Sequence, residues 1–316
     1  MNIGFLGLGK LGLPVALAVE SKGHNVFGTD INEITLRNIR FKTINYKEKG
    51  AQELLNKSKI QIKNIEQIVN DSDIIFVPIQ TPHDKKYEGI HRIPEERKDF
   101  NYEYLINGIK DLNEEIEKQG KDKVVVIIST VLPGTISKFI KPILGSHLKL
   151  CYNPYFIAMG TTIDDFLGAE INLFGVDDKG ALDKAKEFYK TINNAPFYDT
   201  TIENAELIKV GYNTFISTKI AMINTLMETC HSLPNTNIDD ISKAFALCDK
   251  RLISDKYLYG GMGDGGGCHP RDNIALSYLA DKLNLSYNWY DGIMSQREKQ
   301  TDWLADLISS EKFEMD

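Results

Sequence analysis

Short apolar segments alternate with longer amphipathic segments over about the first 200 residues of the chain. The short ones are rich in β-branched residues and predict strands at Asn2–Leu6, Asn25–Thr29, Asp73–Val77, Val124–Ile128, Lys149–Tyr152, Ile171–Gly175 and Pro196–Asp199. Helical periodicity covers Leu11–Lys22, Tyr102–Lys118 and Gly180–Thr191. Several strands are apolar at every position, which is typical of a parallel sheet covered on both faces. The alternation therefore predicts an α/β domain.

The pattern changes near Asn204, where a long amphipathic stretch begins. Residues 204–231 contain no proline and space their apolar side chains by three and four residues, at Ile208, Tyr212, Phe215, Ile216, Ile220, Ile223 and Met227. This predicts one helix of roughly 40 Å, long enough to span domains or to pack against a partner subunit. Apart from a glycine-rich run at 260–267, the remainder to Ser309 also has helical patterns. We therefore predict two domains, residues 1–200 with the sheet and residues 201–316 with helices.

Composition narrows the class of protein. The chain has 316 residues, 42% hydrophobic and 26% charged, as soluble globular proteins do. Its net charge of −7 provides no basic footprint, so we expect neither nucleic acid nor a membrane as partner. Glycines and a lysine interrupt the apolar N-terminus, which excludes a secretory signal and favours a cytoplasmic location. The four scattered cysteines form no CxxC pair, so we expect neither a metal site nor a disulfide framework.

A glycine-rich turn follows the first predicted strand. Gly7, Gly9 and Gly12 form a GxGxxG motif, with Lys10 and Leu11 between the last two, and Asp30 ends the second predicted strand. The glycines allow a tight turn, a close approach of the backbone to a pyrophosphate, and close packing of the helix on the strand. An acid at the position of Asp30 accepts hydrogen bonds from the adenosine ribose and disfavours a 2′-phosphate. The combination predicts a Rossmann-type fold that binds NAD, against the alternative of a purely structural turn.

Two further loops follow predicted strands of the same sheet. Thr81 and Pro82 end the loop after Asp73–Val77, and Thr130 lies in the loop after Val124–Ile128. Ligands of open α/β sheets bind at the carboxyl ends of the strands, which would place Thr130 beside a nicotinamide or a substrate. The alternatives are a strand-terminating loop and a helix cap. The charged stretch 83–100, which contains a glycine and a proline, is interpreted as a surface excursion.

The second predicted domain contains two clusters of chemically capable residues. Glu206, Lys209 and Asn213 share one face of the long helix, where the lysine and asparagine could stabilise an oxyanion; the alternative is a solvated face. Cys268 follows the glycine-rich run and precedes a proline typical of a first helical turn. A helix N-terminus favours a thiolate, and His269 or Arg271 could add to this effect. The other three cysteines lie among apolar neighbours and are predicted to be inert.

Taken in order, six motifs resemble the UDP-glucose/GDP-mannose dehydrogenase family over nearly the whole chain. They are GLGKLGLP, TP at 81–82, STVLPGT, NPYFIAMG at 153–160, ELIKVGYN at 206–213 and GGGCHPRD at 265–272. The resemblance implies two NAD-dependent oxidations of a nucleotide-sugar primary alcohol, such as that of UDP-glucose, to a carboxylate. It also implies a role in polysaccharide biosynthesis. The 204–231 helix would join two copies of the chain into a homodimer.

The same resemblance implies roles for individual residues. Cys268 would capture the aldehyde as a thiohemiacetal that is then oxidised to a thioester, Lys209 and Asn213 would stabilise the oxyanion, and Asp272 and Thr130 would complete this network. Cofactor binding is assigned to Gly7, Gly9, Lys10, Leu11, Gly12, Asp30, Thr81, Pro82 and Thr130. Substrate binding is assigned to Tyr155, Phe156, Lys209, Asn213, Arg251 and Gly265, with Arg251 reaching into the neighbouring subunit.

Two features depart from the family pattern. Tyr155 and Met159 replace two glutamates that assist thioester hydrolysis, although general-base assistance is worth roughly 10²–10⁴-fold in rate. Asp272, Asp164 and Asp165 are the replacement candidates nearest in sequence. The sequence also ends where the family continues into a nucleotide-holding domain, which we expect to be lacking or supplied by another chain. Two alternative functions are therefore a two-electron dehydrogenase of another hydroxy substrate and a non-catalytic NAD-binding partner protein.

Overall fold

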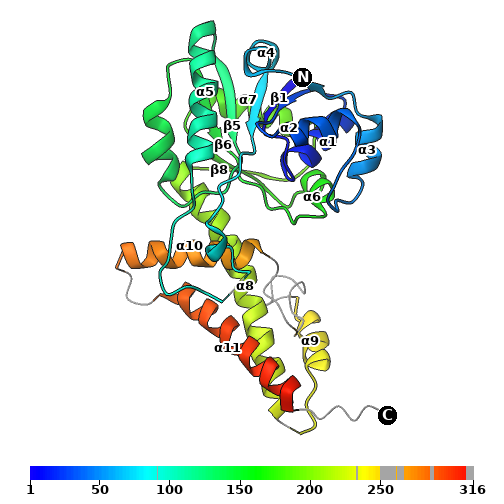
Figure 1. Ribbon diagram of the computed structural model, residues 1–316, viewed down its shortest axis with the longest axis vertical. Coiled ribbons are helices and arrows are strands. Elements are labelled where there is room, and N and C mark those ends of the chain that lie inside the picture. The colour runs from blue at the N-terminus through cyan, green and yellow to red at the C-terminus, as the bar shows by residue number, and fades with distance from the viewer. Residues whose placement is uncertain (91, 233, 250–260, 262–266, 285–287, 311–316) are drawn as a thin grey trace. The chain divides into compact units, whose positions relative to one another are not determined.

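The computed structural model describes residues 1–90, 92–232, 234–249, 261, 267–284 and 288–310 (Figure 1). The chain divides into two compact units. The first comprises Met1–Thr81 and Tyr102–Lys209, and the second comprises Pro82–Asn101 and Val210–Asp316. The first unit therefore extends past the predicted boundary at residue 200. It also omits a segment, 82–101, that the sequence pattern had assigned to it.

An eight-stranded sheet forms the centre of the first unit, in the order β3-β2-β1-β4-β5-β6-β7-β8. The strands are β1 (Asn2–Leu6), β2 (Asn25–Thr29), β3 (Gln61–Ile62), β4 (Ile74–Val77), β5 (Lys123–Ile127), β6 (Leu148–Tyr152), β7 (Asn172–Val176) and β8 (Phe197–Thr200). All neighbouring strands are parallel except β6 and β7, which are antiparallel. The predicted α/β class is confirmed. The sheet is otherwise parallel, as the pattern of apolar strands predicted.

Helices cover the sheet and bury its apolar strands. They are α1 (Gly12–Ser21), α2 (Glu33–Arg40), α3 (Ala51–Lys57), α4 (Ile65–Asp71), α5 (Glu103–Gln119), α6 (Thr162–Leu167) and α7 (Lys179–Tyr189). One core cluster joins β1, β4 and α7 through aromatic rings, with Phe76 lying 5.5 Å from Phe5 and 5.1 Å from Phe188 between ring centroids. The strand order reverses between β1 and β4, so the loops after these two strands diverge at the carboxyl edge of the sheet.

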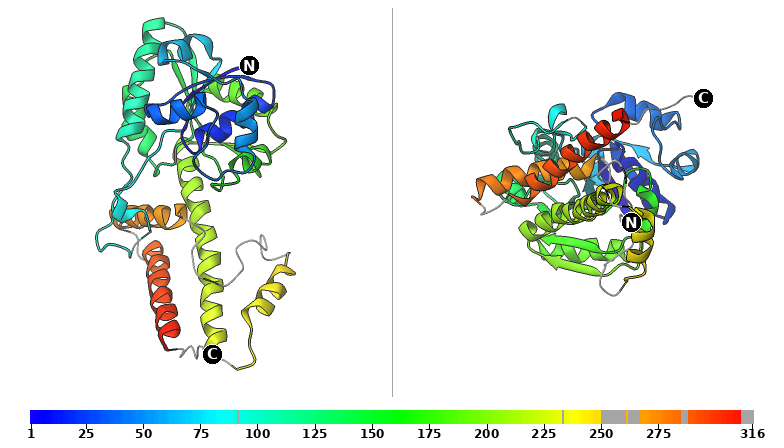
Figure 2. Two further views of the ribbon diagram at one scale, coloured as in Figure 1. Left: turned by 45° about the vertical axis from the view of Figure 1, so that its right-hand side comes forward. Right: turned by 90° about the horizontal axis from the view of Figure 1, so that it is seen from below.

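The second unit consists of helices and one extended segment. Helix α8 (Ile202–Ser232) starts in the first unit and continues through the second as the long helix that the sequence predicts. It is followed by α9 (Ile238–Ala246), α10 (Cys268–Lys282) and α11 (Trp289–Ser310). Both views in Figure 2 show α10 and α11, in orange and red, joined as a helix pair. The prediction of a helical second region is thus confirmed for the described residues.

The segment 82–101 belongs to the second unit and is not a surface excursion. Tyr87, at the end of the 3₁₀ turn Lys85–Tyr87, is fully buried and packs with Ile274 of α10 and Met294 of α11. Salt bridges from Arg92 to Glu298 (3.1 Å) and from Arg97 to Asp291 fix the segment to α11. The high charge of this stretch therefore serves ion pairing within the unit, while its few aromatic residues are buried.

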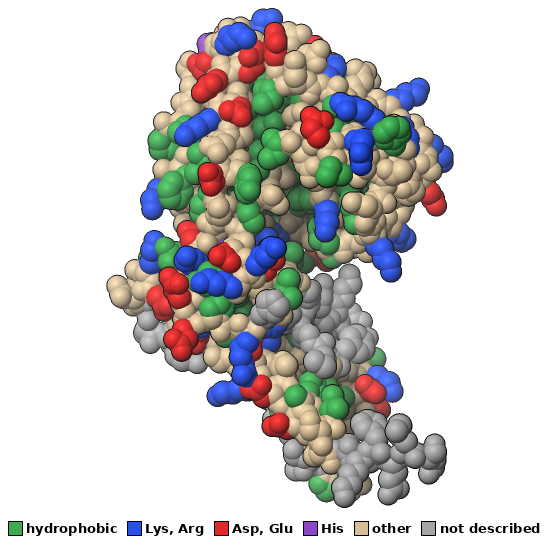
Figure 3. Space-filling view, viewed as in Figure 1, with side chains coloured by type: hydrophobic (Ala, Val, Ile, Leu, Met, Phe, Trp, Pro, Cys, Tyr) green, Lys and Arg blue, Asp and Glu red, His purple; other side chains and the backbone are tan. Residues whose placement is uncertain are grey.

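Charged side chains of both signs are interspersed on the face shown in Figure 3. This distribution offers no single-sign field to a polyanion on that face. No helix in the described part of the chain is long and apolar enough to cross a membrane.

Candidate active site

The glycine-rich turn between β1 and α1 has the geometry that its sequence predicts. Gly7 has a φ of +118°, which side-chain-bearing residues rarely adopt, and a Cβ on Gly12 would lie 2.2 Å from the Gly7 carbonyl oxygen. Around Gly9 the space that a Cβ would occupy has no neighbouring atom within 4 Å. No side chain caps the start of α1 at Leu11. The Leu13 N–H donates to the Gly9 carbonyl oxygen (3.0 Å) and Pro14 has no N–H, so the turn can offer an anion its other backbone N–H groups, such as that of Gly12. A pyrophosphate fits this turn.

Asp30 at the end of β2 is tied to the same turn. Its Oδ2 accepts a hydrogen bond from the backbone N–H of Leu8 (2.8 Å), and its Oδ1 accepts one from Asn32 (2.8 Å). The carboxylate keeps further lone pairs for ribose hydroxyls, because two oxygens offer about four acceptor positions. Sequence reasoning predicted a ligand-facing role for Asp30 but not its bond to the glycine-rich turn. Lys10 of this turn is exposed.

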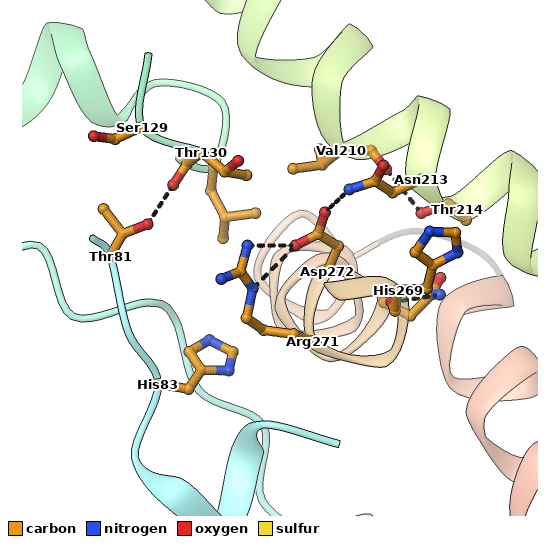
Figure 4. Close-up of polar contacts among 12 residues, drawn as sticks. Thr81, His83, Ser129, Thr130, Val210, Asn213, Thr214, His269, Arg271 and Asp272 are labelled. Carbon is orange, nitrogen blue, oxygen red and sulfur yellow. Dashed lines mark hydrogen bonds and ion pairs between the residues drawn. The ribbon is translucent and has the colours of Figure 1, made fainter. Parts of the chain in front are cut away.

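The loops after β4 and β5 lie side by side in the first unit. The Thr81 hydroxyl donates to the Thr130 carbonyl oxygen at 2.6 Å (Figure 4). The Ser129 hydroxyl donates to the Ile79 carbonyl oxygen at 2.5 Å. Thr81 and Thr130 therefore lie together at the carboxyl edge of the sheet. Pro82, the next residue, is the first of the second unit.

The NPYFIAMG segment places its two departures from the family pattern in different surroundings. Tyr155 is buried in the core of the first unit, and its hydroxyl lies 2.9 Å from that of Tyr189. Burial raises the pKa of Tyr155 well above its usual value. The Met159 side chain is half exposed. A buried phenol with an intramolecular partner is placed poorly for contact with a substrate, so this geometry does not favour the predicted substrate-binding role of Tyr155.

The carboxylates predicted as substitutes for the missing glutamates are already engaged. Asp164 pairs with Lys49 at 2.7 Å. Asp165 accepts hydrogen bonds from the Ala158 N–H (2.8 Å) and from the Thr161 hydroxyl (2.9 Å). Asp165 thus stabilises the turn around Ala158 and Thr161, and Asp164 is paired with Lys49.

Glu206, Lys209 and Asn213 are all buried on α8, with exposed fractions of 0%, 7% and 6%. This burial excludes the alternative of a solvated helix face. The Lys209 Nζ lies 5.5 Å from the ring centroid of Phe156, another predicted substrate residue. Glu206 accepts hydrogen bonds from the backbone N–H groups of Gly134 (2.6 Å) and Ile136 (2.9 Å), in the loop that contains Thr130. Burial raises the pKa of Glu206 to about 7.

The second unit brings Asn213 and Asp272 together. The Asn213 side-chain amide donates a hydrogen bond to the Asp272 carboxylate, which is fully buried (Figure 4). Arg271 lies 3.4 Å from the other carboxylate oxygen and 5.1 Å above the Phe100 ring. Asn213 of α8 and Asp272 of α10, which the resemblance assigns to one network, are thus in contact.

Cys268 is exposed and is the first residue of α10. Because Cys268 and Asp272 are four residues apart on this helix, they share one face. Cys151 is buried, and burial raises its pKa to about 12. Cys248 is exposed, so the prediction that it lies among apolar neighbours is wrong. Arg251 and Gly265 lie outside the described residues.

Sequence reasoning missed His83 and Phe100 in the segment 82–101. Both are buried, and their rings lie 4.6 Å apart between centroids. The His83 Nδ1 contacts the Tyr87 carbonyl oxygen at 3.0 Å, and burial lowers the pKa of His83. The aromatic residues in an otherwise charged stretch were the available signal. In the described residues no group of three or more His, Cys, Asp or Glu could hold a metal ion.

Two family profiles match most of the chain. The profile of the UDP-glucose/GDP-mannose dehydrogenase family, NAD binding domain, matches residues 1–193, and that of the family's central domain matches residues 203–296. The UDP-glucose 6-dehydrogenase of Rickettsia conorii is 28% identical over 98% of the chain and 69% of its own length. The GDP-mannose 6-dehydrogenase of Pseudomonas aeruginosa is 26% identical over 98% of the chain and 71% of its own length.

Solved structures agree with this grouping. A UDP-glucose dehydrogenase from Pyrobaculum islandicum has the same fold, with a TM-score of 0.83 and 24% identity over 94% of this chain and 68% of its own. A ternary complex of GDP-mannose dehydrogenase from Pseudomonas aeruginosa has a TM-score of 0.72 and 25% identity over 99% of this chain and 72% of its own. The motifs, the glycine-rich turn and these matches agree. The chain belongs to the UDP-glucose/GDP-mannose dehydrogenase family, and its cofactor is NAD.

Proposed function

We propose that this chain oxidises the primary alcohol of a nucleotide sugar, of the UDP-glucose type, to the carboxylate, with Cys268 as the nucleophile. One observation carries the proposal. The exposed Cys268 thiol shares a face of α10 with Asp272, whose buried carboxylate is bonded to the Asn213 amide. A protein that only binds NAD has no use for a thiol and a buried polar pair in this arrangement.

Gly7, Gly9, Gly12 and Asp30 would hold the NAD, the glycines through their backbone and Asp30 through the ribose hydroxyls. When bound, NAD supplies the hydride acceptor for both oxidations. Thr81 fixes Thr130 by its bond to the carbonyl oxygen, which leaves the Thr130 side chain in a fixed loop at the carboxyl edge of the sheet.

Cys268 would act after the alcohol has become an aldehyde. Its thiolate attacks the aldehyde carbon, a C–S bond forms, and the carbonyl electron pair becomes an oxyanion that takes up a proton. Loss of the hydroxyl proton and of a second hydride leaves a thioester. Water then adds, the C–S bond breaks, the thiolate leaves, and the carboxylate is released. The balance is one water consumed and two NAD reduced for each alcohol.

Lys209 and Asn213 would stabilise the oxyanion. Both donors are buried and lie one turn apart on α8. Preorganised donors in a site with little water stabilise developing charge more than solvent does. Asp272 would keep the Asn213 amide in its orientation through their hydrogen bond.

A second candidate function is supported by the surroundings of the missing glutamates. Tyr155 is buried in the core, and Asp164 and Asp165 are bonded to the NPYFIAMG turn or to Lys49. With Tyr155 in place of a glutamate and with both aspartates engaged, thioester hydrolysis would be slow, or the reaction would end at two electrons on another hydroxy substrate.

We further propose a homodimer formed through α8. Ile208, Tyr212, Phe215 and Met222 lie along this helix at spacings of three, four and seven residues, and each exposes at least 36% of its surface. A line of exposed apolar side chains along a helix of 31 residues is typical of an interface between subunits.

The test is a panel of UDP-sugars and GDP-sugars with NAD, in which NADH is counted against products identified by mass. Two NADH per released uronate would support the main proposal. One NADH per aldehyde, or an acyl group retained on Cys268, would support the slow-hydrolysis candidate. Full four-electron turnover by Cys268→Ala would contradict the covalent role of the cysteine, and NAD binding without turnover of any substrate would favour a partner protein.

A further inference from the structure

Glu206 lies fully buried on α8, three residues before Lys209. Its carboxylate is the only described acceptor for two backbone N–H groups of one loop, Gly134 (2.6 Å to Oε2) and Ile136 (2.9 Å to Oε1). Each oxygen therefore holds a different point of the chain. A bond of this charge-assisted kind is roughly twice as strong as one between neutral groups.

The loop held by Glu206 is the one that contains Thr130. Its start is fixed by the Thr81 hydroxyl on the Thr130 carbonyl oxygen, and Gly134 turns the chain at a φ of +88°. From Ile136 the chain continues as a short π-helix to Ile140. Glu206 thus caps this helix from outside. All these residues belong to the first unit.

The surroundings of Glu206 give its charge little compensation. The charged groups that influence it are Glu203, one turn earlier on α8, and Lys141, after the π-helix. Glu203 disfavours the ionised form of Glu206 and is itself bonded to the Ser137 hydroxyl at 2.5 Å. Among the described residues, Glu206 has no ion pair to offset its burial, and a carboxylate buried in this way is destabilising unless another role requires it.

We propose that Glu206 is a positioning residue, whose ionised carboxylate sets the Thr130 loop against the turn of α8 that contains Lys209. The proposal rests on the roles proposed above for Thr130 and Lys209. An ionised carboxylate accepts two N–H bonds, whereas a protonated one has only a single strong acceptor oxygen. Protonation of Glu206 therefore weakens one of the two bonds, the loop loses its fixed position, and turnover falls.

The same geometry dictates which substitution is informative. Glu206→Gln keeps the size of the side chain, but its NH₂ group faces one of the two backbone N–H groups, so two donors meet. Glu203→Gln is the matched control, because Glu203 is on the same helix, faces the same loop and bonds only to a hydroxyl and to its own helix start.

The experiment measures kcat and KM of wild type, Glu206→Gln and Glu203→Gln from pH 5.5 to 9. We expect Glu206→Gln to lower kcat about tenfold or more, since small misplacements of catalytic groups cost up to about 10²-fold, with both KM values nearly unchanged. Wild type should lose kcat below pH 7, and Glu203→Gln should lose it at a lower pH, because Glu203 no longer disfavours the ionised form of Glu206. Glu206→Gln should have a low kcat that does not decrease further at acid pH. The proposal would be overturned if Glu206→Gln had the kcat of wild type, or if its kcat decreased below pH 7 in the same way as that of wild type.

A second measurement does not depend on the substrate. Hydrogen exchange of peptides covering 130–140, corrected for the intrinsic pH dependence, should show protection in wild type that decreases below pH 7. Glu206→Gln should lack this protection at every pH. If no nucleotide sugar is turned over but the exchange behaves in this way, the proposed function fails, while the positioning of the Thr130 loop by Glu206 is still supported. If protection is the same in wild type and Glu206→Gln, Glu206 does not position this loop and the proposal is wrong.

Discussion

The Asn213 amide donates a hydrogen bond to the Asp272 carboxylate across 59 residues of sequence. Asp272 has no exposed surface, and Arg271 lies 3.4 Å from its second oxygen. The carboxylate is thus held by a neutral donor on one side and a cation on the other. This pair joins α8 to α10 inside the second unit and adjoins the turn that begins with Cys268.

Removal of this carboxylate should destabilise the second unit. Asp272→Ala leaves the Asn213 amide buried without its acceptor and removes the partner of Arg271, which we expect to cost about 2–4 kcal/mol in the free energy of unfolding. Asp272→Asn keeps an acceptor for Asn213 and should cost less. Urea denaturation of the three proteins measures the difference. Equal stability of Asp272→Ala and wild type would show that the pair contributes nothing.

Thiol reactivity distinguishes Cys268 from the other exposed cysteine. Cys268 begins α10, whereas Cys248 follows the end of α9. Because helix N-termini favour the thiolate, we expect Cys268 in a Cys248→Ser protein to react about tenfold faster at pH 7 than Cys248 in a Cys268→Ser protein. Stopped-flow modification with a chromogenic disulfide measures both rates. Equal rates would favour the view that the chain binds NAD without catalysis.

Asp30 should contribute to both the affinity for NAD and the selection against NADP. Asp30→Asn keeps an oxygen for the Leu8 N–H but removes the acceptor of the Asn32 N–H and the negative charge beside the ribose. We expect the Kd for NAD to rise about tenfold, equal to about 1.4 kcal/mol, and the preference over NADP to decrease. Glu33→Gln, in the first turn of α2, is the control and should leave both values unchanged. Calorimetric titration with each cofactor measures them.

The strong periodic elements of this fold could be predicted from the sequence. The apolar strands β1 and β2 and the long helix α8 have patterns that few other structures allow, and each lies within two residues of its predicted bounds. Helices α2, α3, α4 and α6 were missed because they have six to eight residues, too few for a periodic signal. The antiparallel pairing of β6 with β7 is a tertiary property that no local pattern records.

The site was predictable in its residue types and less so in its contacts. The spacing of Lys209 and Asn213 on a helix and the position of Cys268 after glycines were readable from the sequence. That Glu206 caps a loop 70 residues earlier was not, because the bond joins elements by folding alone. The segment 82–101 was wrongly predicted to be a surface excursion, for a physical reason. Its arginines form ion pairs with α11, and a charge that is paired in the fold is identical in sequence to one that is solvated.

Substitution in the exposed apolar line of α8 should separate the proposed dimer. Phe215 is 50% exposed in the single chain. Phe215→Asp would place a charge at the centre of the interface without a partner, which is strongly unfavourable. We expect a monomer in light scattering after gel filtration. Ile34→Asp, a similarly exposed position on α2, is the control and should remain dimeric. A monomeric wild type would refute the proposed interface.

The burial of Glu206 predicts how stability depends on pH. Its pKa is about 7 in the folded protein, above the value of 4.5 for an unperturbed glutamate, so the folded state binds the proton more tightly than the unfolded state. The contribution of Glu206 to stability is therefore complete below pH 4.5 and is lost as the pH rises to about 7. The loss should be on the order of 3 kcal/mol, since each pKa unit equals about 1.4 kcal/mol.

Denaturation of wild type, Glu206→Gln and Glu203→Gln at pH 5 and pH 8 measures this loss. Each glutamine variant replaces one of the two neighbouring carboxylates, so the other titrating groups cancel in the comparison. Wild type and Glu203→Gln should lose stability between the two pH values relative to Glu206→Gln. Glu206→Gln would then lose less stability than wild type at high pH, although its turnover is lower. The reason is that the ionised carboxylate stabilises the position of a loop but decreases the free energy of unfolding of the whole protein. Parallel pH dependence in wild type and Glu206→Gln would mean that the carboxyl group is not perturbed by its burial.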